Sequence, residues 1–394
     1  MTPDPLRARV EQAADRLPEL IGHRRHLHRN PEVGLELPDT HAYLADALAD
    51  LGLRPRVRPG AGVTAVVRGR SAGPVAILRS DMDALPVQEA SGEPFASQRP
   101  GAMHACGHDL HMAMLLGAAA CLAEQPPAHD TVLVFQPGEE ADRGAVPTLA
   151  AHPELSAAEG TAFAVHVHAT WESGRVFTRP GTFMAYGDWF RIGFRGPGGH
   201  ASQPHLAGNP IVAGAEFVLA LREEAARLRG EEFLVATVTE SLMGNTVNVI
   251  PAHGGLRGTL RTFSPRQRDA LLAGLRRIAS EAAAASGLAV EVEVIEGYPA
   301  VVNDEEYVAG LTGTLTEAGF PVGSMPEPST VIEDFAYFLQ RWPGAMVYLG
   351  AAVPGRTAFN HAADVVFDES VLSTGAALHL IAADRGAGWA GRPA

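Results

Sequence analysis

The order of apolar and polar positions divides the first half of the chain into alternating helices and strands. Charged and apolar residues recur at helical spacing near the N-terminus, whereas the later runs are short, apolar and rich in Val, which is typical of strands. Helices are predicted at 5–29, at 40–52 and after His108, and strands at 63–69, 75–83, 131–137 and 161–169. This alternation predicts an α/β fold with a layered sheet that contains some parallel strand pairs.

The pattern changes near residue 185, where strands and two long helices follow one another. Strands are predicted at 188–196, 233–239, 246–250, 255–263 and 289–296, and helices at 210–230 and 265–286. This order is typical of a compact α+β unit. After Tyr298 the chain returns to helix and strand, so we predict a discontinuous main domain of residues 1–186 and 298–394, interrupted by an inserted domain of residues 187–297.

Composition and charge restrict the partners of the protein. The chain has 394 residues and a formal net charge of −14, and every fixed positive side chain is arginine because the sequence contains no lysine. This acidic balance argues against a nucleic-acid or anionic-membrane surface, since both require clustered positive charge. Two cysteines do not make a disulfide framework in a chain of this length. The polar start predicts that there is no cleaved signal, and no apolar run is long enough to predict a membrane span. We therefore expect a cytoplasmic protein.

The stretch HACGHDLHMAMLLGAA, residues 104–119, places Cys106 among histidines immediately before an apolar helix. In a regular helix, Cys106 and His108 would point about 200° apart, but in a loop that enters the helix they can converge. A thiolate at this position, like Asp109, would be stabilised by the helix N-terminus. The alternative is an ordinary buried cysteine with surface histidines nearby. His104 and His111 receive no role.

Three other segments end apolar runs with side chains that can bind metal. Glu139 and Glu140 follow a strand, His166 ends the run FAVHVH, and His361 lies in the loop FNHAAD. Taken singly, these residues could be solvated glutamates, a core histidine and a surface histidine. Together with Cys106 they form a set of thiolate, imidazole and carboxylate ligands, which suits Zn²⁺, Mn²⁺ or Co²⁺ better than Ca²⁺ or Mg²⁺.

The motifs resemble those of the aminoacylase and carboxypeptidase family of dinuclear metallopeptidases. The resemblance is strongest to its amidohydrolase subgroup, which holds N-acyl-amino-acid, hippurate and auxin-conjugate hydrolases. The matching stretches run in family order from residue 25 to 370: RHLHRNPEVGLE, LRSDMDALPVQE, MHACGHDLHMAMLLGAA, VFQPGEE, AVHVHATWESG, GPGGHASQPH, NVIP with GTLRTF, IEDFAYFL and FNHAADVVFDES. The implied fold is a mixed-sheet, zinc-peptidase-like catalytic domain with an inserted α+β, ferredoxin-like lid or dimerisation domain.

The resemblance implies a two-metal site in each subunit. Its ligands would be Cys106, His108, Glu140, His166 and His361, with Cys106 as the bridging thiolate where other family members use an aspartate. Glu139 matches the general base that takes a proton from a metal-activated water and returns it to the leaving amine. Asp83 matches an aspartate that supports the site, although a strand-terminal cap is the alternative, and Asp81 stands where other branches have a ligand histidine.

The inserted domain matches the lid domain of the family, which implies a homodimer formed through residues 187–297. His200, in GGHAS, matches a histidine that stabilises the oxyanion, commonly from the partner subunit. Asn248 and Arg261 match residues that hold the substrate, and the planar guanidinium of arginine suits a free α-carboxylate. The alternatives are a loop histidine and an arginine on a solvated strand. Glu333 and Asp334 are left outside the catalytic set.

Several positions depart from the subgroup pattern. Gly138 stands where alanine is common, and Asn209 replaces a frequent aspartate. His168 is followed by ATWES, which leaves the side-chain specificity open, and the segment 225–245 also differs. None of these changes removes a ligand or the base.

The sequence therefore predicts a metal-dependent hydrolase whose substrates are small molecules, the N-acyl amino acids, and which cleaves their amide bond. It would release a carboxylic acid, from an N-acetyl, N-benzoyl or similar group, and a free amino acid. A dipeptidase or aminopeptidase of the same superfamily is the alternative within hydrolases. A non-catalytic binding module on the same fold is the alternative of another class, and Glu139 beside Glu140 argues against it because a binding module needs no base.

Overall fold

The computed structural model describes residues 5–140, 143–155, 159–230 and 233–386, and the chain divides into two compact units. Unit 1 comprises Met1–Phe183, Val302–Glu327 and Asp334–Ala394, and unit 2 comprises Met184–Val301 and Pro328–Glu333. Unit 2 differs from the predicted insertion of residues 187–297 in beginning at Met184, in extending to Val301 and in including Pro328–Glu333. Within the described ranges, the helices are all too short or too polar to cross a membrane.

Unit 1 contains an eight-stranded sheet with both parallel and antiparallel pairs, so the predicted mixed-sheet α/β fold is confirmed. The pairs β3–β4, β3–β5, β5–β16 and β6–β15 are parallel, and β1–β2, β2–β4 and β6–β16 are antiparallel. In spatial order the strands are β1 (Arg56–Arg58), β2 (Gly62–Val67), β4 (Thr131–Gln136), β3 (Val75–Asp81), β5 (Gly160–His168), β16 (Gly344–Gly350), β6 (Val176–Thr178) and β15 (Val322–Ser324).

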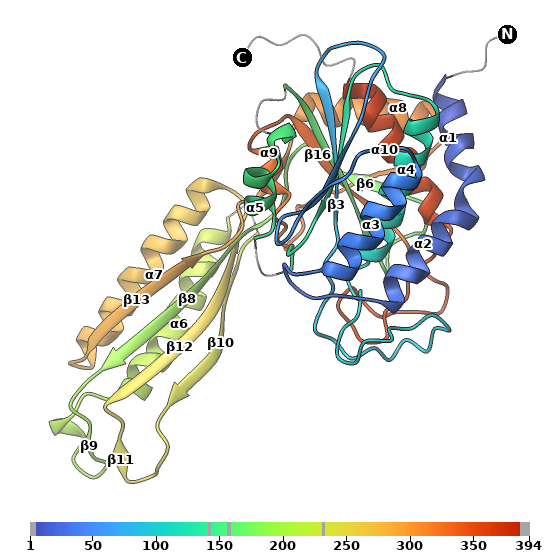
Figure 1. The fold of residues 1–394 in the computed structure, drawn as a ribbon. Helices are drawn as coiled ribbons and strands as arrows, with labels where there is room; N and C mark the ends of the chain where they lie inside the picture. The colour runs from blue at the N-terminus through green and yellow to red at the C-terminus, as the bar shows by residue number, and fades with distance from the viewer. Residues whose placement is uncertain (1–4, 141–142, 156–158, 231–232, 387–394) are drawn as a thin grey trace. The chain divides into compact units, whose positions relative to one another are not determined.

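The helices of unit 1 are α1 (Pro5–Asp15), α2 (Leu17–Arg29), α3 (Pro38–Asp50), α4 (His108–Glu124), α5 (Ala145–Ala151), η1 (Pro153–Leu155), α8 (Glu305–Glu317), α9 (Ala336–Leu339) and α10 (Val371–Gly386). Among these helices, α3, α4, α8 and α10 contact the sheet, and α1 and α2 pack against α4 and α10 (Figure 1). The single helix predicted at 5–29 is therefore two helices, because α2 begins anew with a proline in its first turn.

The helix α4 lies in the centre of unit 1 and is buried from His108 to Leu122. It packs against α2, α10 and β3. The close contact with α2 depends on Gly117, where a Cβ atom would lie 2.5 Å from Leu20 Cδ2. A helix that is apolar on all sides is stable only in such a core, which is why this segment can fix the loop before it.

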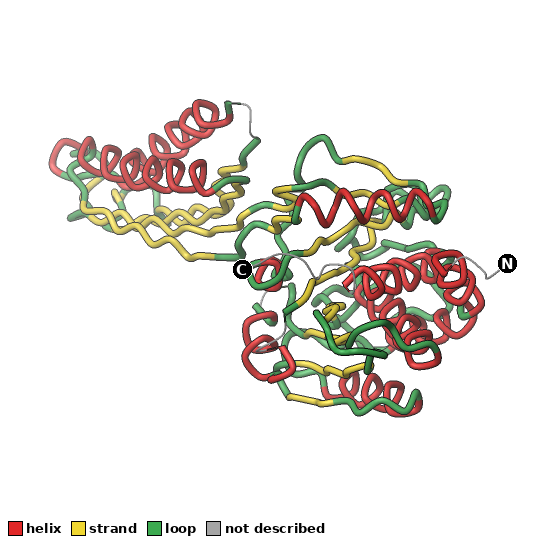
Figure 2. Tube along the Cα trace, turned by 90° about the horizontal axis from the view of Figure 1, so that it is seen from above, coloured by secondary structure: helices red, strands yellow, loops and turns green. Residues whose placement is uncertain are grey.

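Unit 2 has a four-stranded antiparallel sheet in the order β10 (Val235–Met243), β12 (His253–Thr262), β8 (Tyr186–Arg195) and β13 (Ala289–Glu296). The helices α6 (Pro210–Arg229) and α7 (Pro265–Ala285) lie together on one side of the sheet (Figure 2). Alternate strand residues such as Phe190, Ile192 and Phe194 form the core beneath them. In unit 2 the short strands β9 (Gly199–His200) and β11 (Val249–Ile250) pair with each other, and η2 is Pro204–Leu206. The strands β7 (Gly181–Met184) and β14 (Val301–Asn303) also pair with each other, where the chain passes from one unit to the other.

The strand predicted at 233–239 is longer and begins later than expected, at Val235. Residues 231–232 lie outside the described part of the chain. Beyond Val238 the strand continues to Met243 because it keeps its pairing with β12 past an irregularity between Val238 and Glu240. The strand predicted at 246–250 is shorter in the structure, where only β11 (Val249–Ile250) is formed.

Candidate metal centre

The backbone geometry before α4 turns Cys106 and His108 toward the same region. Gly107, between them, has a φ of 91°, and a Cβ atom there would lie 2.4 Å from Val167 Cγ2. Only glycine fits this left-handed, crowded position. His108 begins the helix while Cys106 remains in the preceding turn, so the two side chains avoid the divergence that a continuous helix would impose.

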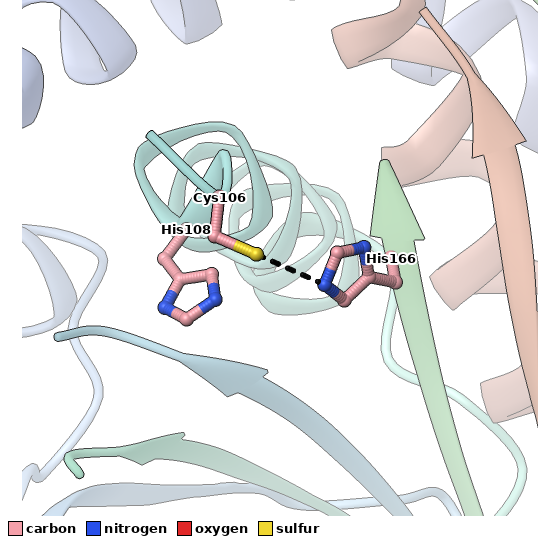
Figure 3. Close-up of side chains that lie close together, drawn as sticks. All are labelled: Cys106, His108 and His166. Atoms are coloured by element: carbon pink, nitrogen blue, oxygen red, sulfur yellow. Dashed lines mark hydrogen bonds between the residues drawn. The ribbon is translucent and has the colours of Figure 1, made fainter. Parts of the chain in front are cut away.

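Cys106, His108 and His166 form the first group of potential ligands (Figure 3). Their ligand atoms lie within 4.8 Å of one another, and Cys106 Sγ is 3.4 Å from His166 Nε2. His108 Nδ1 donates to the backbone O of Asp83 (2.8 Å), and His166 Nδ1 donates to the backbone O of Val167 (2.9 Å). Because a carbonyl oxygen only accepts, both Nε2 atoms are left with a free lone pair, as a metal ligand requires.

Cys106, Glu140 and His361 form a second group, and its ligand atoms also lie within 4.8 Å of one another. His361 Nε2 lies 3.3 Å from Cys106 Sγ and 3.4 Å from Glu140 Oε1. Cys106 Sγ is thus common to both groups, as the predicted bridging thiolate would require. His361 comes from a segment 255 residues away in the sequence, and its half-exposed ring lies at the outer side of the group.

The glutamate pair is held from its backbone by Asp83. Asp83 Oδ1 accepts the N–H of Glu139 (3.0 Å), and Asp83 Oδ2 accepts the N–H of Glu140 (3.1 Å). The side chain of Glu139 is buried, and its carboxylate falls within 4.8 Å of ligand atoms of His108 and Glu140. Asp83 therefore fixes Glu139, Glu140 and, through its carbonyl, the tautomer of His108.

The donor set fits divalent cations. His108 Nε2 and Glu140 Oε1 are buried without a hydrogen-bond partner and lie 3.8 Å apart. Burial raises the pKa of Glu140 to about 7 and raises the pKa of the Cys106 thiol well above its usual value. A buried polar atom without a partner is costly, and a cation both satisfies these atoms and favours their deprotonated forms.

Asp81 and His111 also lie near the first group, but they do not have the arrangement of ligands. His111 Nδ1 donates to Asp81 Oδ1 (2.6 Å), and His111 Nε2 accepts the N–H of Val167 (2.9 Å). Both ring nitrogens are therefore occupied. Because Val167 follows His166, this pair supports the strand end that carries His166. The sequence alone does not indicate this role of His111, because the contact joins α4 and β5, which are far apart along the chain.

Charged side chains that the sequence left without a role form buried networks around the site. Asp334 binds Arg79 (3.0 Å) and the side-chain amide of Gln136 (2.8 Å), and Arg79 also binds Asp81 (2.7 Å). Asp109 binds Arg24 at 2.8 Å. His104 is buried, and burial lowers its pKa to about 4.

His168 lies two residues beyond His166 and stacks on Trp171, with ring centroids 4.2 Å apart. Tyr348 contacts the rings of His166, His168 and Trp171 edge-on. The divergent segment ATWES thus contributes to an aromatic wall beside a potential ligand. Burial lowers the pKa of His168 to about 4, so this ring is neutral at physiological pH.

The candidate residues of unit 2 are not brought together within one chain. His200 pairs with Val249 in the β9–β11 hairpin, next to Asn248, whose carbonyl accepts the N–H of Ala201. Arg261 instead pairs with Gly187, at the opposite end of β8 from Arg195. Eight residues of strand separate those ends, which corresponds to about 26 Å. Figure 1 shows β9 and β11 at the tip of the sheet.

His200 is exposed and has a defined tautomer. Its Nδ1 accepts the N–H of Ser202 at 3.1 Å, so the ring proton of the neutral form is on Nε2 and can be donated. Arg261 donates to the carbonyl of Leu260 at 2.8 Å, and burial lowers its pKa.

Comparison with known proteins places the fold and site in a family context. The model of "Peptidase family M20/M25/M40" matches residues 77–385. An N-acetyl-L-cysteine deacetylase of Bacillus subtilis is 36% identical over 346 residues, which cover 84% of this chain and 80% of the relative. Thermostable carboxypeptidase 2 of Saccharolobus solfataricus is 35% identical over 378 residues, covering 92% and 94%. A Bacillus subtilis structure, described as a dinuclear metal-binding peptidase of the M20 family, has a TM-score of 0.83 with 29% identity and covers 94% of this chain and 98% of that one.

Proposed function

Because the chain belongs to peptidase family M20/M25/M40, which confirms the resemblance inferred from its motifs, we propose that it is a metal-dependent hydrolase of N-acyl amino acids. The reaction cleaves the amide bond and releases a carboxylic acid and a free amino acid. The observation that carries the proposal is Cys106 Sγ, which is shared by two groups of ligands beside the buried carboxylate of Glu139. The N-acetyl-L-cysteine deacetylase relative supports this class of substrate.

Five side chains hold two divalent cations in this proposal. Cys106, His108 and His166 bind one ion, and Cys106, Glu140 and His361 bind the other. Zn²⁺, Mn²⁺ and Co²⁺ suit this mixture of thiolate, imidazole and carboxylate. When bound, such ions lower the pKa of water and polarise the amide carbonyl.

Glu139 acts as the general base. Its backbone is fixed by Asp83, and its buried carboxylate lies beside His108 and Glu140, within reach of both ion positions. Glu139 accepts a proton from the attacking water and delivers it to the leaving amine, so that the same carboxylate serves both halves of the reaction.

Unit 2 serves as lid and dimerisation domain. His200 donates its Nε2 proton to the developing oxyanion, and Asn248 and Arg261 bind the substrate. Arg261 lies beside Gly187 in β8, about 26 Å along the strand from Arg195, the end of β8 that leads to His200. This separation supports a homodimer, in which the β9–β11 hairpin of one subunit contributes His200 to the site of the other. The two free cysteines support a cytoplasmic location, because the thiol of Cys106 must remain reduced to bind metal.

An activity screen tests the proposal. The purified protein is loaded with Zn²⁺, Mn²⁺ or Co²⁺ and offered N-acetyl, N-benzoyl and long-chain N-acyl amino acids beside dipeptides. Faster hydrolysis of N-acyl amino acids supports the proposal. Preference for peptides supports the second candidate, a dipeptidase or other peptidase, which the similarity to a carboxypeptidase favours.

Two matched variants separate catalysis from metal binding. We expect Glu139→Gln to reduce kcat by about 10²–10⁴-fold with unchanged metal content, because it removes only the base. Glu140→Gln should instead lower metal content. A Glu139→Gln protein that retained full activity would exclude Glu139 as the base, and absence of hydrolysis of every substrate would favour a non-catalytic binding module.

A further inference from the structure

We infer that Asn360 is a positioning residue. It orients His361 as a ligand of the ion that Cys106 and Glu140 also bind in the proposal. The inference rests on the proposed two-metal function but assigns a role to a residue outside the ligand set. It starts from the backbone of His361, which has a φ of 73°. Among the described non-glycine residues, only Arg143 also has a positive φ. A residue with a side chain adopts a positive φ only where contacts with the surrounding structure hold its backbone in that conformation.

The amide of Asn360 provides that support through three hydrogen bonds. Its Nδ2 donates to the backbone O of Cys106 (3.2 Å) and of Val167 (3.1 Å), and its Oδ1 accepts the N–H of Ala169 (3.0 Å). The N–H of His361 in turn donates to the O of Ala105 at 2.8 Å. The loop of His361 is thereby tied both to the turn before α4 and to the end of β5.

Three of the remaining ligands make further hydrogen bonds that do not involve the side chain of Asn360. His108 and His166 are fixed by hydrogen bonds from their Nδ1 atoms to backbone carbonyls, and Glu140 is fixed by Asp83. The ring of His361 is 53% exposed, so packing alone does not orient it. Loss of Asn360 should therefore affect the ion bound by His361 before it affects the ion bound by His108 and His166.

The chemistry of the three contacts requires an amide. Leucine has nearly the same shape as asparagine but can neither donate nor accept. Aspartate can accept from Ala169, but its second oxygen would face two carbonyl oxygens and repel them. Both replacements of Asn360 should free the loop and release His361 from its strained backbone conformation.

Asn303 offers a matched control. Its buried amide has a similar pattern, with Nδ2 donating to the backbone O of Arg179 and Met346, and Oδ1 accepting the N–H of Met346. None of these partners is next to a candidate ligand in the sequence. Asn303→Leu therefore reports the general cost of removing such an amide, without a direct effect on the ligands.

The test measures metal binding directly. Wild type, Asn360→Leu and Asn303→Leu are loaded with Mn²⁺, freed of excess ion and analysed for manganese per chain and by electron paramagnetic resonance. Wild type and Asn303→Leu should hold two ions with the signal of an exchange-coupled pair. Asn360→Leu should hold one ion with the signal of isolated Mn²⁺, and should bind the second ion about 10–100-fold more weakly.

Two results would overturn the inference: Asn360→Leu with two coupled ions at wild-type affinity, or a folded Asn360→Leu that loses both ions in parallel. Circular dichroism checks folding, and Asn360→Ser, which keeps a hydrogen-bonding group, replaces the leucine variant if that one does not fold. A wild-type protein that binds fewer than two ions would refute the two-metal proposal itself. The wild-type measurement thus distinguishes that failure from a failure of the role given to Asn360.

Discussion

The carboxylate of Asp83 accepts the backbone N–H of Glu140 with one oxygen while its other oxygen accepts the N–H of Glu139. One side chain, two residues beyond the end of β3, therefore fixes both members of the glutamate pair that follows β4. Since β3 and β4 are parallel neighbours, their carboxyl ends meet at one edge of the sheet. This contact explains how a loop can hold a base and a ligand in fixed positions.

Replacing Asp83 by alanine should impair both stability and activity. One buried and one partly buried N–H group would lose their acceptor, which corresponds to a decrease of about 3 kcal/mol in the free energy of unfolding. We expect kcat/KM to fall at least 10-fold. Urea denaturation and steady-state kinetics measure the two effects. The control is Asp130→Ala, which removes a carboxylate that accepts the N–H of Gly69 away from the site. Equal kinetic effects in both variants would contradict a specific role for Asp83.

Replacing Cys106 by serine should reduce metal content. A neutral hydroxyl is a poor bridging ligand, whereas a thiolate can contribute charge to both ions. Metal analysis by mass spectrometry should show fewer than two ions per chain, and activity should fall with the metal content. Cys121→Ser, at the other buried cysteine, serves as the control and should retain two ions. Unchanged stoichiometry in Cys106→Ser would exclude the bridge.

The stability of the protein should decrease as the pH rises above about 6.5, because of His28. Burial by itself lowers the pKa of His28, but Asp109 and Glu89 outweigh this effect and raise the pKa, while Arg24 opposes them. A group whose pKa is raised on folding stabilises the protein fully below its unfolded pKa, about 6.5, and this contribution disappears as the pH rises through the folded pKa.

We therefore expect the free energy of unfolding to decrease above pH about 6.5 by up to about 1.4 kcal/mol per pH unit, until the folded pKa is passed. Urea denaturation of wild type and His28→Gln at several pH values measures this dependence. The variant should lack that part of the slope. Parallel curves for the two proteins would show that His28 does not cause it.

The outer face of α6 is expected to contact a second subunit. Leu219 is 52% exposed, and Ile211 and Val218 are exposed on the same helix, so a surface element of unit 2 carries apolar side chains. Leu219→Glu should convert the dimer to a monomer in sedimentation experiments and reduce activity, because His200 would no longer reach the partner's site. Ala49→Glu adds the same charge to an exposed position of α3 in unit 1 and should leave the dimer intact. A Leu219→Glu dimer, or a fully active wild-type monomer, would contradict this arrangement.

Much of the architecture follows from local patterns in the sequence. The periodicity predicted the strands β3, β4 and β5 and the helices α6 and α7, because alternation and helical spacing record which face of an element is buried. The break between α1 and α2 and the length of β10 depend on a proline start and on cross-strand pairing, so the periodicity alone misplaced them.

The sequence by itself determined the kinds of side chain available for metal chemistry, and their ordered motifs identified the family. Only the tertiary structure decided which of these side chains meet. It brought Cys106 next to His361 across 255 residues, and it placed His111 in a structural contact with Asp81 and Val167. The supporting role of Asp83 and the contacts of Asn360 also appear only in the folded chain. The physical reason is that a ligand type is a local property, whereas the direction and hydrogen-bond partner of a side chain are set by elements that folding brings together.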